Sequence, residues 1–318
     1  MSAESTVQRP PEPDWLTMTD EELFAYRDAE NRFRASAAAR AFTGEPHPGV
    51  VIEWRDLPLP GRELPVRVYR PAEEDGVALP LVVHVHGGGF VGTAVQSDWI
   101  NSHLAARLPS VVVSVEHRLV APEHPLADAV DDGWDALRHL AGAAGTWGID
   151  PDRVAVAGES CGGLISALAA IRARDAGLRL RAQVLVNPAV DATAAMFGYP
   201  SVTEYAHTPT LGIPVLRLFQ RLAVPPGTDA RALSPVHAED LSGLAPALVV
   251  VPTHDPLADH GRRYAERLAA AGTPARLSEY AGAGHAFLST PGLAPQAETA
   301  AAEILGFLGT SFAAGAAA

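Results

Sequence analysis

The sequence predicts an α/β fold in which a mostly parallel central sheet is covered by helices on both faces. Runs of apolar and β-branched residues alternate with segments rich in helix formers over most of the chain. Strands that are apolar at nearly every position are typical of parallel sheets buried on both sides. One such run, residues 154–157, leads through a glycine-flanked serine directly into a helical segment, as strand–helix units of this class do.

Length and composition indicate a single globular domain over residues 1–318. Hydrophobic residues make up 47% of the chain and charged residues 19%, which allows a substantial core. The single cysteine excludes an internal disulfide, and residues 1–6 lack the pattern of a signal peptide. No stretch reaches the roughly 20 apolar residues of a membrane span. We therefore predict a cytoplasmic protein.

The charge of the chain narrows the class of partner. The formal net charge is −13, whereas binding to nucleic acid or to anionic membranes requires a basic surface. We therefore expect neither nucleic acid nor a membrane as a partner. The sequence leaves the oligomeric state open, and a homodimer is compatible with it.

The first part of the chain predicts a helix followed by two antiparallel strands. The helix is predicted over residues 14 to about 42. Thr19 and the three acidic residues after it have the pattern of an N-cap and a first helical turn. Residues 50–57 and 64–70 alternate apolar and polar side chains, with a Pro-Gly turn between them. This pattern predicts an antiparallel hairpin at one edge of the sheet.

The other core strands are short apolar runs with helices between them. Strands are predicted at residues 79–86, 110–115, 154–157, 182–186, 246–251 and 275–280. Helices are predicted at residues 98–108, 127 to about 145, 161 to about 176, 260–271 and 296–312. Together they predict a core of about residues 46–190 and 235–312.

Two segments do not fit the alternation of strands and helices. Residues of about 191–234 are too long for a simple crossover between two core strands, and residues of about 14–45 precede the sheet. We predict that these segments form a helical cap. Ligands bind at the carboxyl ends of the strands in open α/β sheets, and the cap is expected there.

The segment Gly158–Gly162 has the pattern Gly-x-Ser-x-Gly between a strand and a helix. A serine at such a turn is held in a strained conformation that exposes its hydroxyl, and the chain passes so close to itself that the flanking positions must be glycine. The helix that begins at Cys161 directs free N–H groups toward the space above Ser160. The pattern alone also describes an ordinary glycine-rich turn, so its interpretation depends on the partners of the serine.

A catalytic serine requires a base and an acid that orients the base. His285 lies in a glycine-rich loop after the last predicted strand, and Asp255 follows the preceding strand. Loops that follow parallel strands meet at the same edge of the sheet, which favours both residues. Asp259 is a nearby alternative for the acid.

The segment His86–Phe90, His-Gly-Gly-Gly-Phe, directly follows a core strand. Three glycines free the backbone to direct N–H groups inward, where side chains would obstruct them. Such N–H groups stabilise the oxyanion of acyl-transfer reactions. The segment is therefore a candidate for the second half of an oxyanion hole.

These motifs together resemble the hormone-sensitive-lipase family of α/β-hydrolase esterases, the bacterial carboxylesterases with a His-Gly-Gly-Gly motif. The agreement covers roughly residues 50–310 and includes the segments 86–90, 118–125, 158–163, 255–259 and 284–287. The resemblance implies an α/β-hydrolase fold with a helical cap. It implies Ser160 as nucleophile, His285 as base and Asp255 as orienting acid, in the chain order of that fold.

The resemblance also implies an oxyanion hole formed by the backbone N–H groups of Gly88, Gly89 and Cys161. Four positions depart from the usual pattern of the family: Glu159 stands where aspartate is commonest, Cys161 where alanine is, His117 where tyrosine is usual, and Ala286 where glycine is frequent. None of these departures removes a catalytic group.

Two other groups of polar residues have simpler interpretations. His84 and His86 could suggest a metal site, but no set of ligands with the required spacing accompanies them, so we expect no metal. Asp128, Asp131, Asp132 and Asp135 are expected to form a solvated acidic helix face.

These observations predict a serine carboxylesterase that acts on small-molecule esters with short- to medium-chain acyl groups and uses no cofactor. A dedicated deacylase or amidase for one metabolite is an alternative, because the fold alone does not distinguish them. A non-catalytic receptor of the same fold is a further alternative, disfavoured because such receptors have lost the histidine. Tyr205, His207, Leu211 and Leu216 are candidates for the pocket in the cap.

Overall fold

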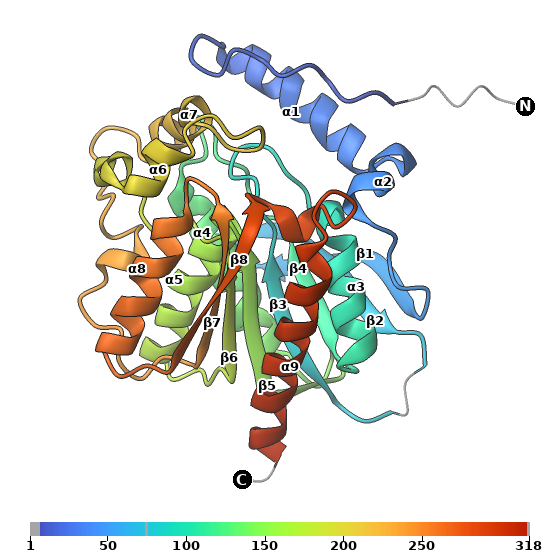
Figure 1. Ribbon diagram of the computed structural model, residues 1–318. Helices are drawn as coiled ribbons and strands as arrows, with labels where there is room; N and C mark the ends of the chain where they lie inside the picture. Colours follow the sequence, from blue (N-terminus) through green and yellow to red (C-terminus); the bar gives the residue numbers. More distant parts are fainter. Residues whose placement is uncertain (1–6, 74–75, 317–318) are drawn as a thin grey trace, which may run out of the picture.

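A mixed sheet of eight strands forms the centre of the protein (Figure 1). The computed structural model describes residues 7–73 and 76–316. The strands are β1 (Val50–Leu59), β2 (Arg62–Pro71), β3 (Leu79–Val85), β4 (Val111–Val115), β5 (Ile149–Glu159), β6 (Ala182–Val186), β7 (Ala247–His254) and β8 (Ala275–Gly284). Their order across the sheet is β1-β2-β4-β3-β5-β6-β7-β8.

The direction of the strands follows the expected pattern. β1 pairs with β2 and β2 with β4 in antiparallel fashion, and the remaining neighbours are parallel. The predicted α/β fold with a mostly parallel sheet is confirmed. β5 and β8 extend beyond the predicted strands, because their ends still pair with β3 and β7 outside the apolar runs.

Helices cover both faces of the sheet. They are α1 (Asp20–Arg34), α2 (Arg40–Thr43), α3 (Asp98–Arg107), α4 (Leu126–Gly142), α5 (Cys161–Asp175), α6 (Pro200–Glu204), α7 (Ile213–Ala223), α8 (Ala258–Ala270) and α9 (Gln296–Ala316). α3 and α9 pack on one face, whereas α4, α5 and α8 pack on the other. Because successive strand residues face opposite sides, Val82 packs against the first group and Val83 against the second.

The N-terminal helix is shorter than the sequence suggests. It begins after Thr19, whose side chain and that of Glu22 form a reciprocal capping box, as the acidic first turn predicts. It ends at Arg34, and a short 3₁₀ turn and α2 follow. Residues 1–6, on which the expectation about a signal peptide depends, lie outside the described residues.

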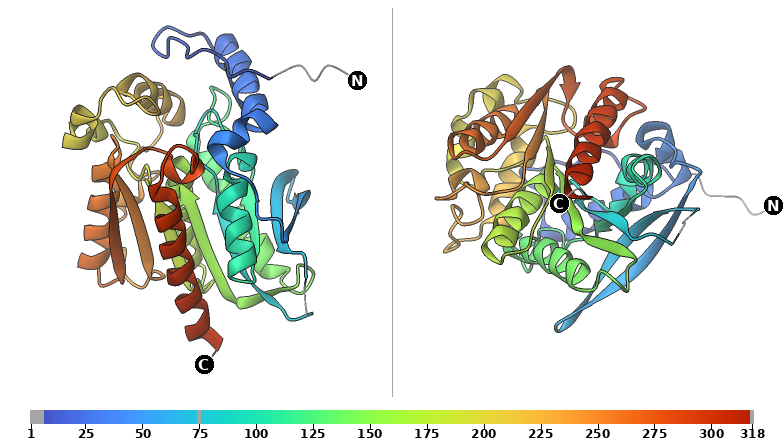
Figure 2. Two further views of the ribbon diagram at one scale, coloured as in Figure 1. Left: turned by 45° about the vertical axis from the view of Figure 1, so that its right-hand side comes forward. Right: turned by 90° about the horizontal axis from the view of Figure 1, so that it is seen from below.

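The carboxyl ends of the parallel strands lie beneath three helices. Figures 1 and 2 show α1, α6 and α7 at this end of the sheet, with the last turns of α9 at the opposite end. α7 packs with its apolar face on the start of α5 and on the loop after β3. Among the described residues, no helix combines the length and the hydropathy needed to cross a membrane.

Candidate active site

Ser160 lies at the sharp turn between β5 and α5. Its backbone has φ 56° and ψ −118°, a combination that residues other than glycine rarely adopt. The flanking glycines are required by space. A Cβ at Gly158 would lie 2.2 Å from the carbonyl oxygen of Gly162, and one at Gly162 would lie 2.1 Å from that of Val85. The turn therefore has the tight, strained geometry that the sequence predicts for it.

His285 bridges Ser160 and Asp255. Its Nε2 lies 2.9 Å from Ser160 Oγ, and its Nδ1 lies 2.8 Å from Asp255 Oδ2. Asp255 is fully buried, and its other carboxylate oxygen accepts a hydrogen bond of 2.8 Å from the backbone N–H of Leu257. The carboxylate is thus fixed in place, and it holds the imidazole ring toward the serine hydroxyl.

Asp259, the alternative acid, has different partners. Its carboxylate accepts hydrogen bonds from the backbone N–H of Ser201 at 2.9 Å and from Arg262 at 3.0 Å. It is therefore engaged with the start of α6 and with its own helix. Of the two carboxylates that follow β7, Asp255 is the one in contact with His285.

Opposing effects act on the pKa of His285. Burial disfavours the imidazolium, whereas the charge of Asp255, its hydrogen bond and the nearby Glu159 carboxylate favour it. The favourable effects are larger, and they raise the pKa of His285 above its usual value of 6.5. Such a histidine is well suited to accept a proton and to hold it during a reaction at neutral or mildly alkaline pH.

Three backbone N–H groups near Ser160 have no internal acceptor. Within the described part of the chain, the amides of Gly88, Gly89 and Cys161 donate no hydrogen bond. The glycine loop and the serine turn lie against each other, because a Cβ at Gly89 would be 3.6 Å from that of Cys161. Unpaired amides at a helix N-terminus and in an adjacent loop can together bind an anionic oxygen.

Side chains are excluded from the glycine loop. Gly88 has φ 95°, and a Cβ there would lie 1.8 Å from the carbonyl oxygen of Val91. A Cβ at Gly89 would lie 2.5 Å from the ring of Phe219 on α7. Sequence reasoning missed Phe219, although the amphipathic pattern of α7 contained a signal for an inward-facing residue.

Glu159 and Cys161, the two residues next to Ser160 that differ from the usual family pattern, have buried side chains. Burial raises the pKa of the Cys161 thiol to about 12, so the thiol stays protonated and acts as a small apolar side chain. Burial also raises the pKa of Glu159, against the opposing effect of a short hydrogen bond that its carboxylate accepts from Ser289. Ser289 was not identified from the sequence.

The histidines near the glycine loop have structural partners. His84 Nδ1 lies 2.9 Å from Ser114 Oγ, and the His86 ring stacks on His117 with a centroid distance of 4.4 Å. Burial lowers the pKa of His86 and of His117 to about 4, so both rings are neutral at physiological pH. Among the described residues, no group of three or more potential ligands is arranged to hold a metal ion.

The expected acidic helix face is solvated only in part, because the Asp131 side chain is 54% exposed whereas one of its neighbours is not exposed at all. Asp132 on α4 is fully buried, and both of its oxygens accept hydrogen bonds from the side chain of Arg118 at 2.9 and 3.0 Å. Arg62 on β2 reaches the same carboxylate at 3.2 Å. The expectation was wrong for Asp132, because a distant strand and loop supply two guanidinium groups that the sequence does not associate with this helix.

The residues suggested for the cap pocket divide into two groups. Leu211 and Leu216 are buried in an apolar cluster with Met196 and Leu257. The Tyr205 ring contacts the His254 ring at a centroid distance of 5.4 Å, with the two planes tilted by 59°, and His207 pairs with Gly212 in an isolated β-bridge.

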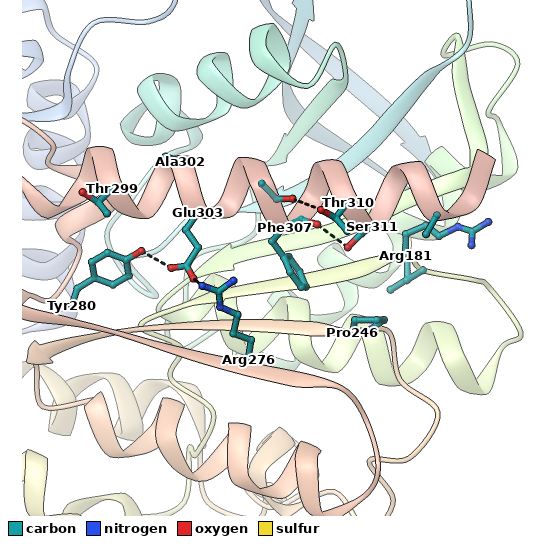
Figure 3. Close-up of a pocket in the computed structure, with 13 residues that line it drawn as sticks. Arg181, Pro246, Arg276, Tyr280, Thr299, Ala302, Glu303, Phe307, Thr310 and Ser311 are labelled. Carbon is teal, nitrogen blue, oxygen red and sulfur yellow. Dashed lines mark hydrogen bonds and ion pairs between the residues drawn. The ribbon is translucent and has the colours of Figure 1, made fainter. Parts of the chain in front are cut away.

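A groove of about 1060 Å³ lies away from Ser160, between α9 and β8. Figure 3 shows that Arg276 and Tyr280 of β8 converge on Glu303 of α9, and the Tyr280 hydroxyl donates to that carboxylate at 2.6 Å. None of the residues that line this groove belongs to the group around Ser160.

Comparisons with known proteins agree with the observed fold. A family model described as an alpha/beta hydrolase fold matches residues 82–289. The chain is 39% identical over 311 residues to the carboxylesterase NlhH of Mycobacterium tuberculosis, covering 93% of this chain and 95% of that protein. It is 32% identical to an ethyl acetate hydrolase of Pseudomonas putida, covering 85% and 86%.

A solved structure is similar over nearly the whole chain. The hyperthermophilic esterase from the archaeon Pyrobaculum calidifontis superposes with a TM-score of 0.82 at 35% sequence identity, covering 93% of this chain and 95% of that chain.

Proposed function

Because this chain belongs to the hormone-sensitive-lipase-like family of α/β hydrolases and is a carboxylic ester hydrolase, we propose that it cleaves short- to medium-chain acyl esters through Ser160, His285 and Asp255. The observation that carries the assignment is the His285 Nε2 to Ser160 Oγ distance of 2.9 Å, with Asp255 on the other ring nitrogen. This is the arrangement that activates a serine hydroxyl.

In the proposed reaction, neutral His285 removes the proton of Ser160 as the serine oxygen attacks the ester carbonyl. The N–H groups of Gly88, Gly89 and Cys161 bind the oxygen that becomes negative. His285 then protonates the leaving alcohol, and an acyl-enzyme remains. A water molecule, deprotonated by the same histidine, then attacks the acyl-enzyme. As the bond to Ser160 Oγ breaks, His285 returns this proton to the serine oxygen and the carboxylic acid is released.

Asp255 has two functions in this scheme. Its hydrogen bond to Nδ1 selects the tautomer in which Nε2 can accept the serine proton. Its charge stabilises the imidazolium that forms during attack, which agrees with the direction of the pKa shift of His285.

The preference for short or medium acyl chains rests on two observations. Phe219 of α7 packs against Gly89, so a large apolar side chain stands directly beside the proposed oxyanion site. A relative that covers most of this chain is named for the hydrolysis of ethyl acetate, a small ester. In the same proposal, α1, α6 and α7 form a cap over the carboxyl ends of the strands, built from residues of about 14–45 and 191–234.

The test is hydrolysis of p-nitrophenyl esters from acetyl to palmitoyl by the wild-type protein and by Ser160→Ala. We expect activity to peak at short or medium chains and to be lost in the variant. Activity that survives in Ser160→Ala would overturn the assignment of the nucleophile. The matching p-nitroanilides, assayed in parallel, distinguish an esterase from an amidase.

A matched pair of variants tests the acid. Asp255→Asn should lower kcat by about 10⁴, because it removes the group that holds the correct tautomer. Asp259→Asn, four residues away, alters a carboxylate that contacts Ser201 and Arg262 and should retain most of the activity. Equal losses in both variants would contradict the assignment of Asp255.

A further inference from the structure

The carbonyl groups of the glycine loop are held by donors from several parts of the chain. The Gly87 oxygen accepts hydrogen bonds from His86 Nδ1 at 2.9 Å and from Gln96 Nε2 at 3.2 Å. The Gly88 oxygen accepts from the Val91 N–H at 2.9 Å. These two carbonyls belong to the peptide units that carry the N–H groups of Gly88 and Gly89.

Holding a carbonyl also fixes the direction of the next N–H group. A peptide unit is planar and trans, so the carbonyl oxygen of one residue and the N–H of the following residue point in opposite directions. The donors to the Gly87 oxygen therefore direct the N–H of Gly88 away from themselves. The donor to the Gly88 oxygen directs the N–H of Gly89 in the same way.

Gln96 is in turn held by the N-terminal helix. Arg34, in the last turn of α1, donates from Nη1 to Gln96 Oε1 at 2.7 Å. Gln96 is 6% exposed, and Arg34 is anchored by Glu30, whose carboxylate lies 3.0 Å from Arg34 Nε and is 2% exposed. A continuous series of contacts thus leads from α1 through Gln96 to the Gly87 carbonyl.

A second arginine of α1 donates hydrogen bonds to the C-terminal end of the glycine loop. Arg27 lies seven residues before Arg34, two helical turns away and on the same side of the helix. It donates to the carbonyl oxygens of Phe90 and Val120, each at 2.7 Å. Val120 also donates its N–H to the Gly89 oxygen at 2.7 Å. Helix α1 therefore contacts the loop at both ends.

We propose that Arg34 and Gln96 are positioning residues that direct the Gly88 N–H into the oxyanion hole, so that helix α1 maintains the transition-state geometry as well as covering the sheet. The inference rests on the proposed function, since it assumes that this N–H binds the oxyanion. Neither residue needs to touch the substrate, because both act through the Gly87 carbonyl.

The test compares two variants with a control on the same helix. Gln96→Glu keeps the oxygen that accepts from Arg34 but loses the N–H donor to Gly87. Arg34→Met removes the shorter of the two hydrogen bonds that Gln96 Oε1 accepts and leaves the one from the Thr93 N–H at 3.4 Å. Arg32→Met, an exposed arginine of the same turn, is the control. Because complete loss of an oxyanion donor costs about 10²–10³ in turnover, a misdirected donor should lower kcat by roughly 10- to 100-fold with KM nearly unchanged.

Two further readouts separate positioning from a folding defect. Inhibition by an aryl trifluoromethyl ketone, which forms an oxyanion with the serine, should weaken in parallel with kcat/KM, whereas a smaller folded fraction would leave the inhibition constant unchanged. Hydrogen–deuterium exchange of the peptide covering residues 86–92 should be faster in Gln96→Glu and Arg34→Met than in Arg32→Met and the wild type.

The outcomes distinguish this inference from the proposed function. If Ser160→Ala stays active, the proposed function fails, and the exchange of residues 86–92 still decides whether Arg34 and Gln96 hold the loop. If activity depends on Ser160 but both variants retain wild-type kcat and inhibition constants, the positioning role is wrong. Unchanged exchange in both variants would also refute it.

Discussion

His285 lies between a buried carboxylate and a serine hydroxyl, and its pKa sets the pH range in which the serine can be activated. Only the neutral imidazole can accept the proton of Ser160, so activity follows the deprotonated fraction. Burial lowers the pKa of His285, but the charge of Asp255, its hydrogen bond and the nearby Glu159 carboxylate together outweigh burial and place this pKa above 6.5.

We therefore expect kcat/KM to rise with pH to a plateau, with a midpoint above 6.5. A solvent-exposed histidine without these partners would give a midpoint near pH 6.5. The measurement is a profile of kcat/KM from pH 5.5 to 9 with an ester that does not itself titrate. A midpoint below 6, or a flat profile, would contradict the assignment of His285 as the base.

The residues around Ser160 show which parts of a site are predictable from a sequence. Ser160, Asp255 and His285 each lie in a short motif directly after a strand, and parallel strands end at a common edge. Arg34 and Gln96 could not be found in this way. Their partners lie 62 and 9 residues away, and the glutamine contacts a backbone carbonyl that has no sequence signature.

At the scale of elements, the end of α1 coincides with a local side-chain hydrogen bond and with the burial of Ala39. The segment after it contains Ala37, Ala38 and Ala39, which favour a continuous helix. The helix nevertheless stops, and the Ser36 hydroxyl donates to the Phe33 carbonyl at 2.6 Å while Ala39 becomes buried. Intrinsic propensity is a weak determinant beside such contacts, and for that reason the boundary was not predictable.

The α4 helix is joined to the sheet by a buried carboxylate. Asp132 accepts four hydrogen bonds from Arg118 and Arg62: one from the Arg118 backbone N–H at 2.9 Å, two from the Arg118 side chain at 3.0 and 2.9 Å, and one from Arg62 at 3.2 Å. Removing one partner of a buried ion pair typically costs 3–5 kcal/mol, because the remaining charge is left without compensation.

Asp132→Ala should therefore lower the free energy of unfolding by about 3 kcal/mol, near the lower limit of that range. The lower value is expected because Arg118 retains its ion pair with Asp128, and Arg62 retains its ion pair with Asp135. The measurement is urea-induced unfolding. Asp131→Asn is the matched control, since Asp131 is also paired with an arginine but its side chain is 54% exposed, and it should cost less than about 1 kcal/mol. Equal effects of the two substitutions would contradict the interpretation.

At the scale of the whole molecule, buried histidines make folding sensitive to pH. Burial lowers the pKa of His84 to about 3 and the pKa values of His86, His117 and His260 to about 4. In the unfolded chain each would have a pKa of about 6.5. Between these values the unfolded state binds protons that the folded state does not, so acidification favours unfolding.

Other groups titrate in different ranges. His285 has a raised pKa, so its contribution to stability is complete below pH 6.5 and is lost as the pH rises through the folded-state value. The net charge of −13 is relieved when carboxylates become protonated, which occurs mainly near pH 4. Burial raises the pKa values of Glu116 and Glu159, so their protonation opposes this trend, whereas the lowered pKa of His103 adds to it. The four buried histidines outnumber the two carboxylates and therefore determine the sign of the slope between about pH 6.5 and 5.

We expect the free energy of unfolding to fall steeply as the pH decreases from 6.5 to 5. Each buried histidine contributes up to about 1.4 kcal/mol per pH unit, so the four together give a slope of several kcal/mol per unit. Such a slope is large relative to the roughly 5–15 kcal/mol that stabilises a typical domain.

Urea unfolding at closely spaced pH values measures the slope. The control is the same series at 0.3 M NaCl, because salt screens surface charges but does not affect the protonation of buried rings. His260→Gln should reduce this slope by up to about 1.4 kcal/mol per pH unit, the contribution of one titrating proton. A stability that stays constant between pH 6.5 and 5 would show that the buried rings accept protons without unfolding.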